Sequence, residues 1–148
     1  GVYGRSKADA ERWVSAALPE ALVIRSSAFF DDEEDGFLSR ALRALARGDL
    51  VELRRDRALS PTYLPDLVHA ALDLLVDRAE GTFHLVNEGA VSPFDFVKRA
   101  AAARGASDRT LREARASEPI VPVYSVLGSE RGVLLPPLED ALERWARA

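Results

Sequence analysis

The sequence predicts an α/β fold in which amphipathic helices alternate with a few short, buried strands. Residues 4–18 place apolar side chains at helical spacing, and Pro19 ends the pattern. The run ALVIRSS (21–27) follows directly, with two β-branched residues and small polar residues at its end, which is typical of a buried parallel strand. A helix that leads straight into a buried strand indicates α/β architecture.

The next elements follow an acidic loop at 31–35 (DDEED). The segment FLSRALRALARG returns to helical periodicity, with Gly48 as the expected C-terminal cap. The short run LVEL (50–53) favours a strand. Residues 60–77 then predict a turn and a helix, with Pro65 in the first helical turn and Asp66 at the positive helix end.

The last third of the chain contains one more strand and two helices. GTFHLVN (81–87) predicts a buried strand, and Ser92 with Pro93 starts a helix that runs to about Ala103. Residues 106–138 are the least regular part, and a short helix ends the chain. Three or four strands are few for a closed parallel sheet, so we expect the chain to be part of a larger sheet-and-helix protein.

Composition limits the classes of function. With 148 residues, 20 basic and 24 acidic side chains and a net charge of −4, the chain fits one domain or a fragment, and a general nucleic-acid or anionic-membrane binder is disfavoured. The absence of cysteine excludes disulfides and thiolate metal ligands. No signal peptide or membrane-spanning run is evident, so we expect a soluble, cytoplasmic protein.

The first residues carry the clearest chemical signal. Tyr3 and Lys7 lie one helical turn apart, so a helix places them on the same face. An ammonium beside a phenol, whose ordinary pKa is about 10, favours the phenolate and equips the pair for proton transfer at a substrate oxygen. Chance alone produces a Tyr-x-x-x-Lys match in a chain of this size about one time in four, so the following helix and strand must support the interpretation.

Five segments in order, YGRSKADAE, ALVIRSSAFF, SPTYLPDLVHAALDLL, GTFHLVNEGAVSPFDF and YSVLGSERGVLLPPLEDAL, resemble the second half of extended short-chain dehydrogenases/reductases. The subgroup that the chain resembles is the dTDP-4-dehydrorhamnose reductase type. The resemblance implies a Rossmann-like α/β fold and NADP- or NAD-dependent reduction of a 4-keto sugar linked to a nucleoside diphosphate.

The resemblance also implies roles for particular residues. The family tyrosine matched by Tyr3 is the catalytic acid/base, and the lysine matched by Lys7 contacts the nicotinamide ribose and lowers the tyrosine pKa. The cofactor-binding residues are then Tyr3, Lys7, Ser26 and Ser27. The substrate-binding residues are then Ala28, Phe29, Phe37, Pro61, Thr62 and Ser125.

In this family the dinucleotide fingerprint precedes the tyrosine, and no Gly-x-Gly spacing occurs in this sequence. We therefore expect a carboxy-terminal fragment that is inactive alone, with residues 1–30 forming a piece of the Rossmann core and 31–148 mostly binding the nucleotide sugar. Unpaired strand edges and apolar faces then predict self-association or pairing with the missing amino-terminal half.

Three positions depart from the family pattern. Ala28 replaces a large aromatic residue, Gly36 replaces an asparagine, and Val121 replaces an arginine suited to forked hydrogen bonds with a diphosphate. These changes leave open a second hypothesis, a non-catalytic sugar-nucleotide-binding or regulatory module. Epimerase or dehydratase chemistry on the same scaffold is a nearer alternative, because those enzymes use the same tyrosine and lysine.

Several other features have structural interpretations. We expect the acidic loop to be solvated rather than to bind a cation, His69 and His84 to have structural roles, and Trp13 and Trp145 to pack in the core. The arginines of the segment 40–47 predict an exposed helix face. A contact with a ligand phosphate is left open for Arg54, Arg55 and Arg57.

Overall fold

A computed structural model describes residues 1–33, 35–115 and 123–148. Groups of one to three short strands separate the helices, as an α/β class predicts, but the eight strands in the described residues exceed the three or four that the sequence predicts. The helices are α1 (Val2–Ala17), α2 (Phe37–Arg47), α3 (Leu64–Val76), α4 (Pro93–Ala103) and α5 (Leu138–Arg147). The strands are β1 (Leu22–Arg25), β2 (Phe29–Phe30), β3 (Val51–Leu53), β4 (Ala58–Leu59), β5 (Thr62–Tyr63), β6 (Gly81–His84), β7 (Leu111–Glu113) and β8 (Tyr124–Ser125).

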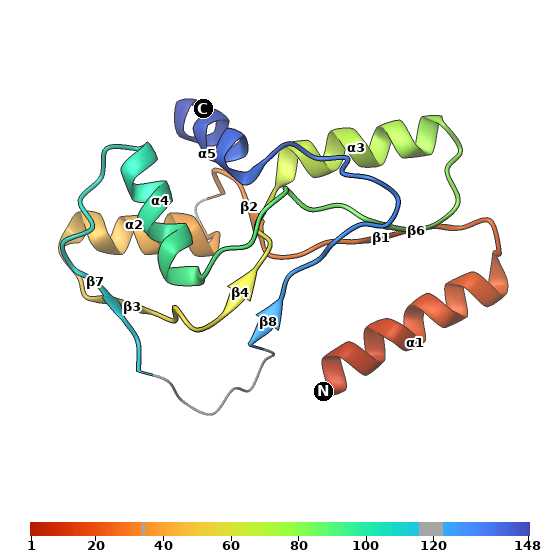
Figure 1. Ribbon diagram of the computed structural model, residues 1–148, viewed down its shortest axis with the longest axis horizontal. Coiled ribbons are helices and arrows are strands. Elements are labelled where there is room, and N and C mark those ends of the chain that lie inside the picture. The colour runs from red at the N-terminus through yellow and green to blue at the C-terminus, as the bar shows by residue number, and fades with distance from the viewer. Residues whose placement is uncertain (34, 116–122) are drawn as a thin grey trace.

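The described strands form four parallel pairs, β1 with β6, β2 with β5, β3 with β7 and β4 with β8. The longest pair runs from Leu22 opposite Gly81 to Arg25 opposite His84. In Figure 1 this pair lies between α3 and α1, whereas α2, α4 and α5 gather at the other end of the molecule. Parallel pairing confirms the α/β class, because parallel strands need crossover connections such as these helices.

Two apolar clusters hold these elements together. The larger one joins α2, α4 and α5 around Phe30 and Trp145, and Phe30 packs on the rings of Tyr63, Phe96 and Trp145. The smaller one lies where α3 covers β1 and β6, with Phe83, Leu85 and Leu135 at its centre. The pair β1–β6, which is followed by Ser26 and Ser27, is therefore packed against α3.

The predicted caps are confirmed. Gly48 follows α2 with φ of 80°, a left-handed conformation that glycine adopts without a Cβ penalty. The Ser92 hydroxyl accepts a hydrogen bond from the Asp95 backbone N–H at 3.0 Å, which caps the start of α4. Helix α2 thus ends, and helix α4 begins, where local sequence chemistry predicts.

The prediction that Trp13 packs in the core is wrong. Trp13 is 75% exposed, and α1 contains no buried residue, because the other described elements do not cover its apolar side. Trp145 is fully buried, as predicted. Helical periodicity identifies an apolar face, but only the tertiary arrangement decides whether another element covers it.

A buried polar network connects α3, α5 and the strands. The Asp66 carboxylate receives two hydrogen bonds from Arg144, at 2.6 and 2.7 Å, and one from Asn87 at 2.8 Å. Asn87 also accepts from the Tyr63 backbone N–H at 2.7 Å and donates to the Pro136 carbonyl at 2.9 Å. Burial raises the pKa of Asp66, but the hydrogen bonds from Arg144 and Asn87 lower it further, so this pKa lies below its ordinary value.

Asp66→Asn is expected to lower the free energy of unfolding at pH 7 by about 1–3 kcal/mol, because it removes charge-assisted hydrogen bonds from a buried site. The depressed pKa of Asp66 adds stability above the unfolded value of about 3.9, and this stability is lost as the pH falls through the lower folded value. The variant should lack this acid-dependent part. Urea unfolding between pH 2 and 7 measures both effects.

Asp140→Asn is the matched control for this measurement. Asp140 pairs with the same guanidinium at 2.9 Å, but it is exposed, so its loss should cost less than about 1 kcal/mol. Equal losses of stability for the two variants would contradict the special contribution of the buried carboxylate.

Candidate active site

The predicted catalytic residues line an open cleft of about 630 Å³ at the end of β1. Helix α1 forms one wall, and the segment after β1 forms the other. The lining residues are Tyr3, Lys7, Glu11, Ile24, Arg25, Ser26, Ser27, Ala28, Phe29 and Leu127. Six of the residues that the sequence assigns to cofactor or substrate therefore share one cleft, although their roles there stay predictions.

Helix α1 presents its polar residues to this cleft at a regular interval. Tyr3, Lys7 and Glu11 are each four positions apart, so they lie along one helix face. The Lys7 ammonium lies 5.6 Å from the centre of the Tyr3 ring, within the range of a cation–π interaction. Both side chains are exposed, so solvent and a ligand can reach the phenol and the ammonium.

Hydrogen bonds fix the segment that follows β1. The Ser26 hydroxyl donates to the Leu85 carbonyl at 2.7 Å and lies 3.3 Å from the Thr62 hydroxyl. The Ala28 carbonyl accepts from the Thr62 backbone N–H at 2.8 Å. Because Ser26 bonds to the protein, Ser27 and the exposed Phe29 are the better placed of these side chains to meet a ligand.

Four predicted substrate residues do not line the cleft. Pro61 and Thr62 are fully buried behind its wall, where Thr62 supports Ser26. Phe37 begins α2 and is partly exposed, and Ser125 lies exposed in β8. Direct contacts between these four residues and a substrate remain predictions.

Sequence reasoning missed four residues of the cleft, namely Glu11, Ile24, Arg25 and Leu127. Glu11 had a usable signal, because it continues the four-residue spacing of Tyr3 and Lys7. Leu127 had none, because it is far from α1 in sequence and reaches the cleft only through the pairing of β8 with β4. The backbone N–H of Leu127 donates to the hydroxyl of the buried Ser60 at 3.2 Å.

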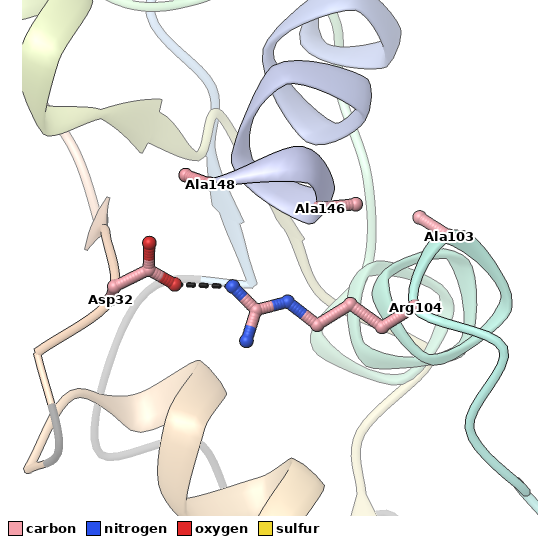
Figure 2. Close-up of a pocket in the computed structure, with 5 residues that line it drawn as sticks. All are labelled: Asp32, Ala103, Arg104, Ala146 and Ala148. Carbon is pink, nitrogen blue, oxygen red and sulfur yellow. Dashed lines mark hydrogen bonds and ion pairs between the residues drawn. The ribbon is translucent and has the colours of Figure 1, made fainter.

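A second hollow, of about 680 Å³, lies between the acidic loop and the ends of α4 and α5. Figure 2 shows Arg104 reaching across this hollow to Asp32, with Ala103, Ala146 and Ala148 around them. The Arg104 guanidinium also lies 3.8 Å from the centre of the Trp145 ring. These contacts attach the acidic loop to the core. They also occupy the charged groups of Arg104 and Asp32 that a ligand would otherwise contact.

The acidic loop and His84 contact other described residues, whereas His69 is exposed. Asp32 and Asp35 are exposed and lie near arginines, and no group of three or more metal-ligating side chains occurs among the described residues. His84 contacts the Gly128 carbonyl and Arg25, whereas His69 is exposed on α3. A packing role for His69 therefore has no support.

The arginine predictions have separate outcomes. Arginines 40, 43 and 47 form an exposed face of α2, as predicted. Arg54 pairs with Asp56, and Arg55 pairs with Asp95 and Glu113. The Nε of Arg57 is buried, and among the described residues it has no hydrogen-bond partner. Val121, where the family carries an arginine, lies outside the described residues.

The parallel α/β arrangement, with a tyrosine and a lysine on the helix beside the end of β1, fits the Rossmann-like short-chain dehydrogenase/reductase class that the sequence resemblance implies. Within this class, the chain belongs to the RmlD substrate binding domain family, whose model matches residues 1–131. None of the helices in the described residues is long and apolar enough to cross a membrane.

Curated relatives support the same family. The chain is 35% identical over 147 residues to a dTDP-4-dehydrorhamnose reductase of Mycolicibacterium smegmatis, covering 94% of this chain and 45% of that protein. It is 33% identical over 156 residues to a probable low-salt glycan biosynthesis reductase of Haloferax volcanii, covering 95% of this chain and 51% of that protein. The chain thus spans about half the length of these relatives.

Solved structures agree with the fold. The crystal structure of a dTDP-4-dehydrorhamnose reductase from Bacillus anthracis in complex with NADP superposes with a TM-score of 0.88 at 25% identity, covering 98% of this chain and 54% of that one. A dTDP-glucose 4,6-dehydratase from the same organism gives a TM-score of 0.72 at 10% identity, covering 95% and 48% of the two chains. The latter likeness concerns the fold alone.

Proposed function

We propose that this chain supplies the proton-transferring pair and the substrate-binding part of an NADP-dependent reductase that acts on a nucleotide-linked 4-keto sugar. The observation that carries the proposal is the cleft in which Tyr3 and Lys7 face the segment Ser26 to Phe29. The names of the relatives support a dTDP-4-dehydrorhamnose type of substrate. NADPH and the nucleotide-linked sugar are charged phosphate compounds that do not cross membranes unaided, so we assign the reaction to the cytoplasm. Reductase activity in the soluble cell fraction tests this assignment.

The groups in the cleft fit the nicotinamide and ribose end of the cofactor. A phenol, an ammonium and a serine hydroxyl are the donor types that hydroxyls of a ribose require, and the cleft is open enough to admit them. Tyr3, Lys7 and Ser27 are the residues that would hold this end. When bound, the reduced cofactor supplies a hydride to the carbonyl carbon of the sugar.

The chain's own part in the reaction is proton transfer. Tyr3 donates its phenolic proton to the carbonyl oxygen, which becomes a hydroxyl as the carbon accepts the hydride, and the phenolate then regains a proton from water. Lys7, one turn further along α1, stabilises the phenolate by its charge. Without Tyr3 the cleft would lose the phenol that the proposal assigns as the proton donor to the developing alkoxide.

The observation that favours a non-catalytic module is Ala28. This residue is exposed and lines the cleft where the family often carries a large aromatic side chain. A smaller residue widens the cleft and removes a surface on which a sugar could stack. A binding module of the same fold would retain the nucleotide-sugar site and lack turnover.

Calorimetric titration of the intact gene product that carries these residues, with NADPH and separately with dTDP, tests the proposal. The reductase proposal expects binding of both ligands and consumption of NADPH when a dTDP-linked 4-keto sugar is added. Binding of dTDP without NADPH binding or turnover would favour the module. A protein that binds neither ligand would refute both proposals.

We further propose that residues 1–30 complete a Rossmann core and that residues 31–148 mostly bind substrate. We also propose that the exposed apolar faces of α1 and α3 are covered by a partner. Trp13 on α1 and Leu75 and Val76 on α3 are each at least 60% exposed. The partner is a cofactor-binding half of the kind the family carries or, in its absence, a second copy. Light scattering of the 148-residue chain at micromolar concentration should show self-association, and a monodisperse monomer would contradict it.

A further inference from the structure

Helix α1 carries the Tyr3–Lys7 pair but is poorly anchored in the described structure. None of its residues is buried, and in Figure 1 it lies apart from the helices that form the larger core cluster. The hydrogen bond from the Ser6 hydroxyl to the Tyr3 carbonyl stays within the helix, and so does the hydrogen bond from Arg12 to Asp9. Among the described residues, the side-chain hydrogen bonds that link α1 to another element are those between Glu11 and Arg25.

The Glu11–Arg25 contact is a forked ion pair. Arg25 Nε lies 2.9 Å from Glu11 Oε1, and its terminal nitrogen lies 2.6 Å from Oε2. Two parallel bonds fix the orientation of both side chains better than a single contact does. Because Glu11 lies four positions after Lys7 on the same helix face, the orientation of this pair also sets the orientation of Tyr3 and Lys7.

The anchor continues from Arg25 into the sheet and the opposite wall of the cleft. His84 lies opposite Arg25 in the β1–β6 register, and its Nε2 is 3.3 Å from an Arg25 nitrogen. His84 Nδ1 is 2.5 Å from the Gly128 carbonyl oxygen. Because a carbonyl only accepts and a guanidinium only donates, Nδ1 is the ring nitrogen that donates to Gly128, and Nε2 is the one that faces Arg25. Gly128 follows Leu127, which lines the cleft.

We propose that Glu11 and Arg25 are positioning residues for the reaction, and that the connection Glu11–Arg25–His84–Gly128 holds the Tyr3–Lys7 helix at a set distance from the opposite cleft wall. The inference rests on the proposed reductase function. Neither Glu11 nor Arg25 needs to touch the substrate, because they act through the orientation of α1.

Glu11→Ala in the intact gene product tests this proposal, with Asp9→Ala as the matched control. Asp9 is an acidic residue on the same helix, but its ion pair with Arg12 stays within the helix. Glu11→Ala should lower kcat roughly tenfold to a hundredfold while KM for the nucleotide sugar changes less than about twofold, because a displaced acid impairs the reaction more than ground-state binding. Asp9→Ala should leave both within about twofold.

Rescue variants separate positioning from a general loss of structure. Arg25→Lys retains the charge but loses the fork, so it should have an intermediate kcat. The exchange variant Glu11→Arg with Arg25→Glu restores a pair of opposite charges and should recover kcat to within about threefold to tenfold of the wild type. An exchange variant that is no more active than the less active of its two component variants, Glu11→Arg and Arg25→Glu, would overturn the proposal. A Glu11→Ala protein with wild-type kcat would overturn it too.

Hydrogen exchange of the same proteins is a readout that needs no turnover. Amides of residues 2–17 should exchange faster in Glu11→Ala than in the wild type and Asp9→Ala, whereas amides of β6 should be unchanged. Unaltered exchange in α1 would overturn the anchoring proposal. If the wild-type protein has no reductase activity, the proposed function fails, and the exchange rates still decide whether Glu11 anchors α1.

Discussion

Tyr3→Phe is expected to lower kcat of the intact gene product for NADPH-dependent reduction of a nucleotide-linked 4-keto sugar by roughly 100- to 10,000-fold, the range of a positioned general acid. The variant keeps the ring beside Lys7 and removes only the hydroxyl, so the cleft is otherwise preserved. Calorimetric affinities for dTDP and NADPH should therefore change much less than kcat. Steady-state kinetics at saturating concentrations of both ligands measure the effect.

Tyr124→Phe is the matched control for this prediction. Tyr124 is 70% exposed in β8 and does not line the cleft, so its hydroxyl should be dispensable for turnover. A Tyr3→Phe protein that keeps wild-type kcat, or one that loses no more than the Tyr124→Phe protein, would contradict the assignment of the proton donor.

Trp145→Ala is expected to cost about 3–5 kcal/mol of the free energy of unfolding, the largest effect on stability that we predict. The Trp145 ring is fully buried, Phe30 packs against it, and Arg104 stacks on it. Its Nε1–H also donates to the Asp31 carbonyl at 2.9 Å, so the substitution leaves a cavity and removes a hydrogen bond. Urea unfolding followed by circular dichroism measures the loss.

Trp13→Ala is the control for this loss, because it removes the same side chain from an exposed position on α1. At protein concentrations low enough to keep the 148-residue chain monomeric, we expect its effect to be within about 0.5 kcal/mol of zero. A large loss in Trp13→Ala would mean that a partner surface covers α1 under the conditions of the measurement. A small loss in Trp145→Ala would contradict the description of the core around α5.

The local pattern of the chain predicted its class and most of its helices. Periodicity and caps identified α2 with Gly48 and α4 with Ser92, because these signals depend on residues that are close in sequence. The spacing of Tyr3 and Lys7 likewise predicted a shared helix face. The two-residue strands β2, β4, β5 and β8 were not predicted, because so few residues have no detectable periodicity.

The sequence by itself determined an α/β chain with a tyrosine and lysine on one helix face, followed by a buried strand with serines at its end. Only the tertiary structure decided which side chains complete the cleft and which helix faces remain uncovered. Leu127 and the Glu11–Arg25 pair come together through contacts between distant segments, and Trp13 is exposed although its helix is amphipathic. The physical reason is that burial and long-range hydrogen bonds depend on the packing of whole elements, which local periodicity does not specify.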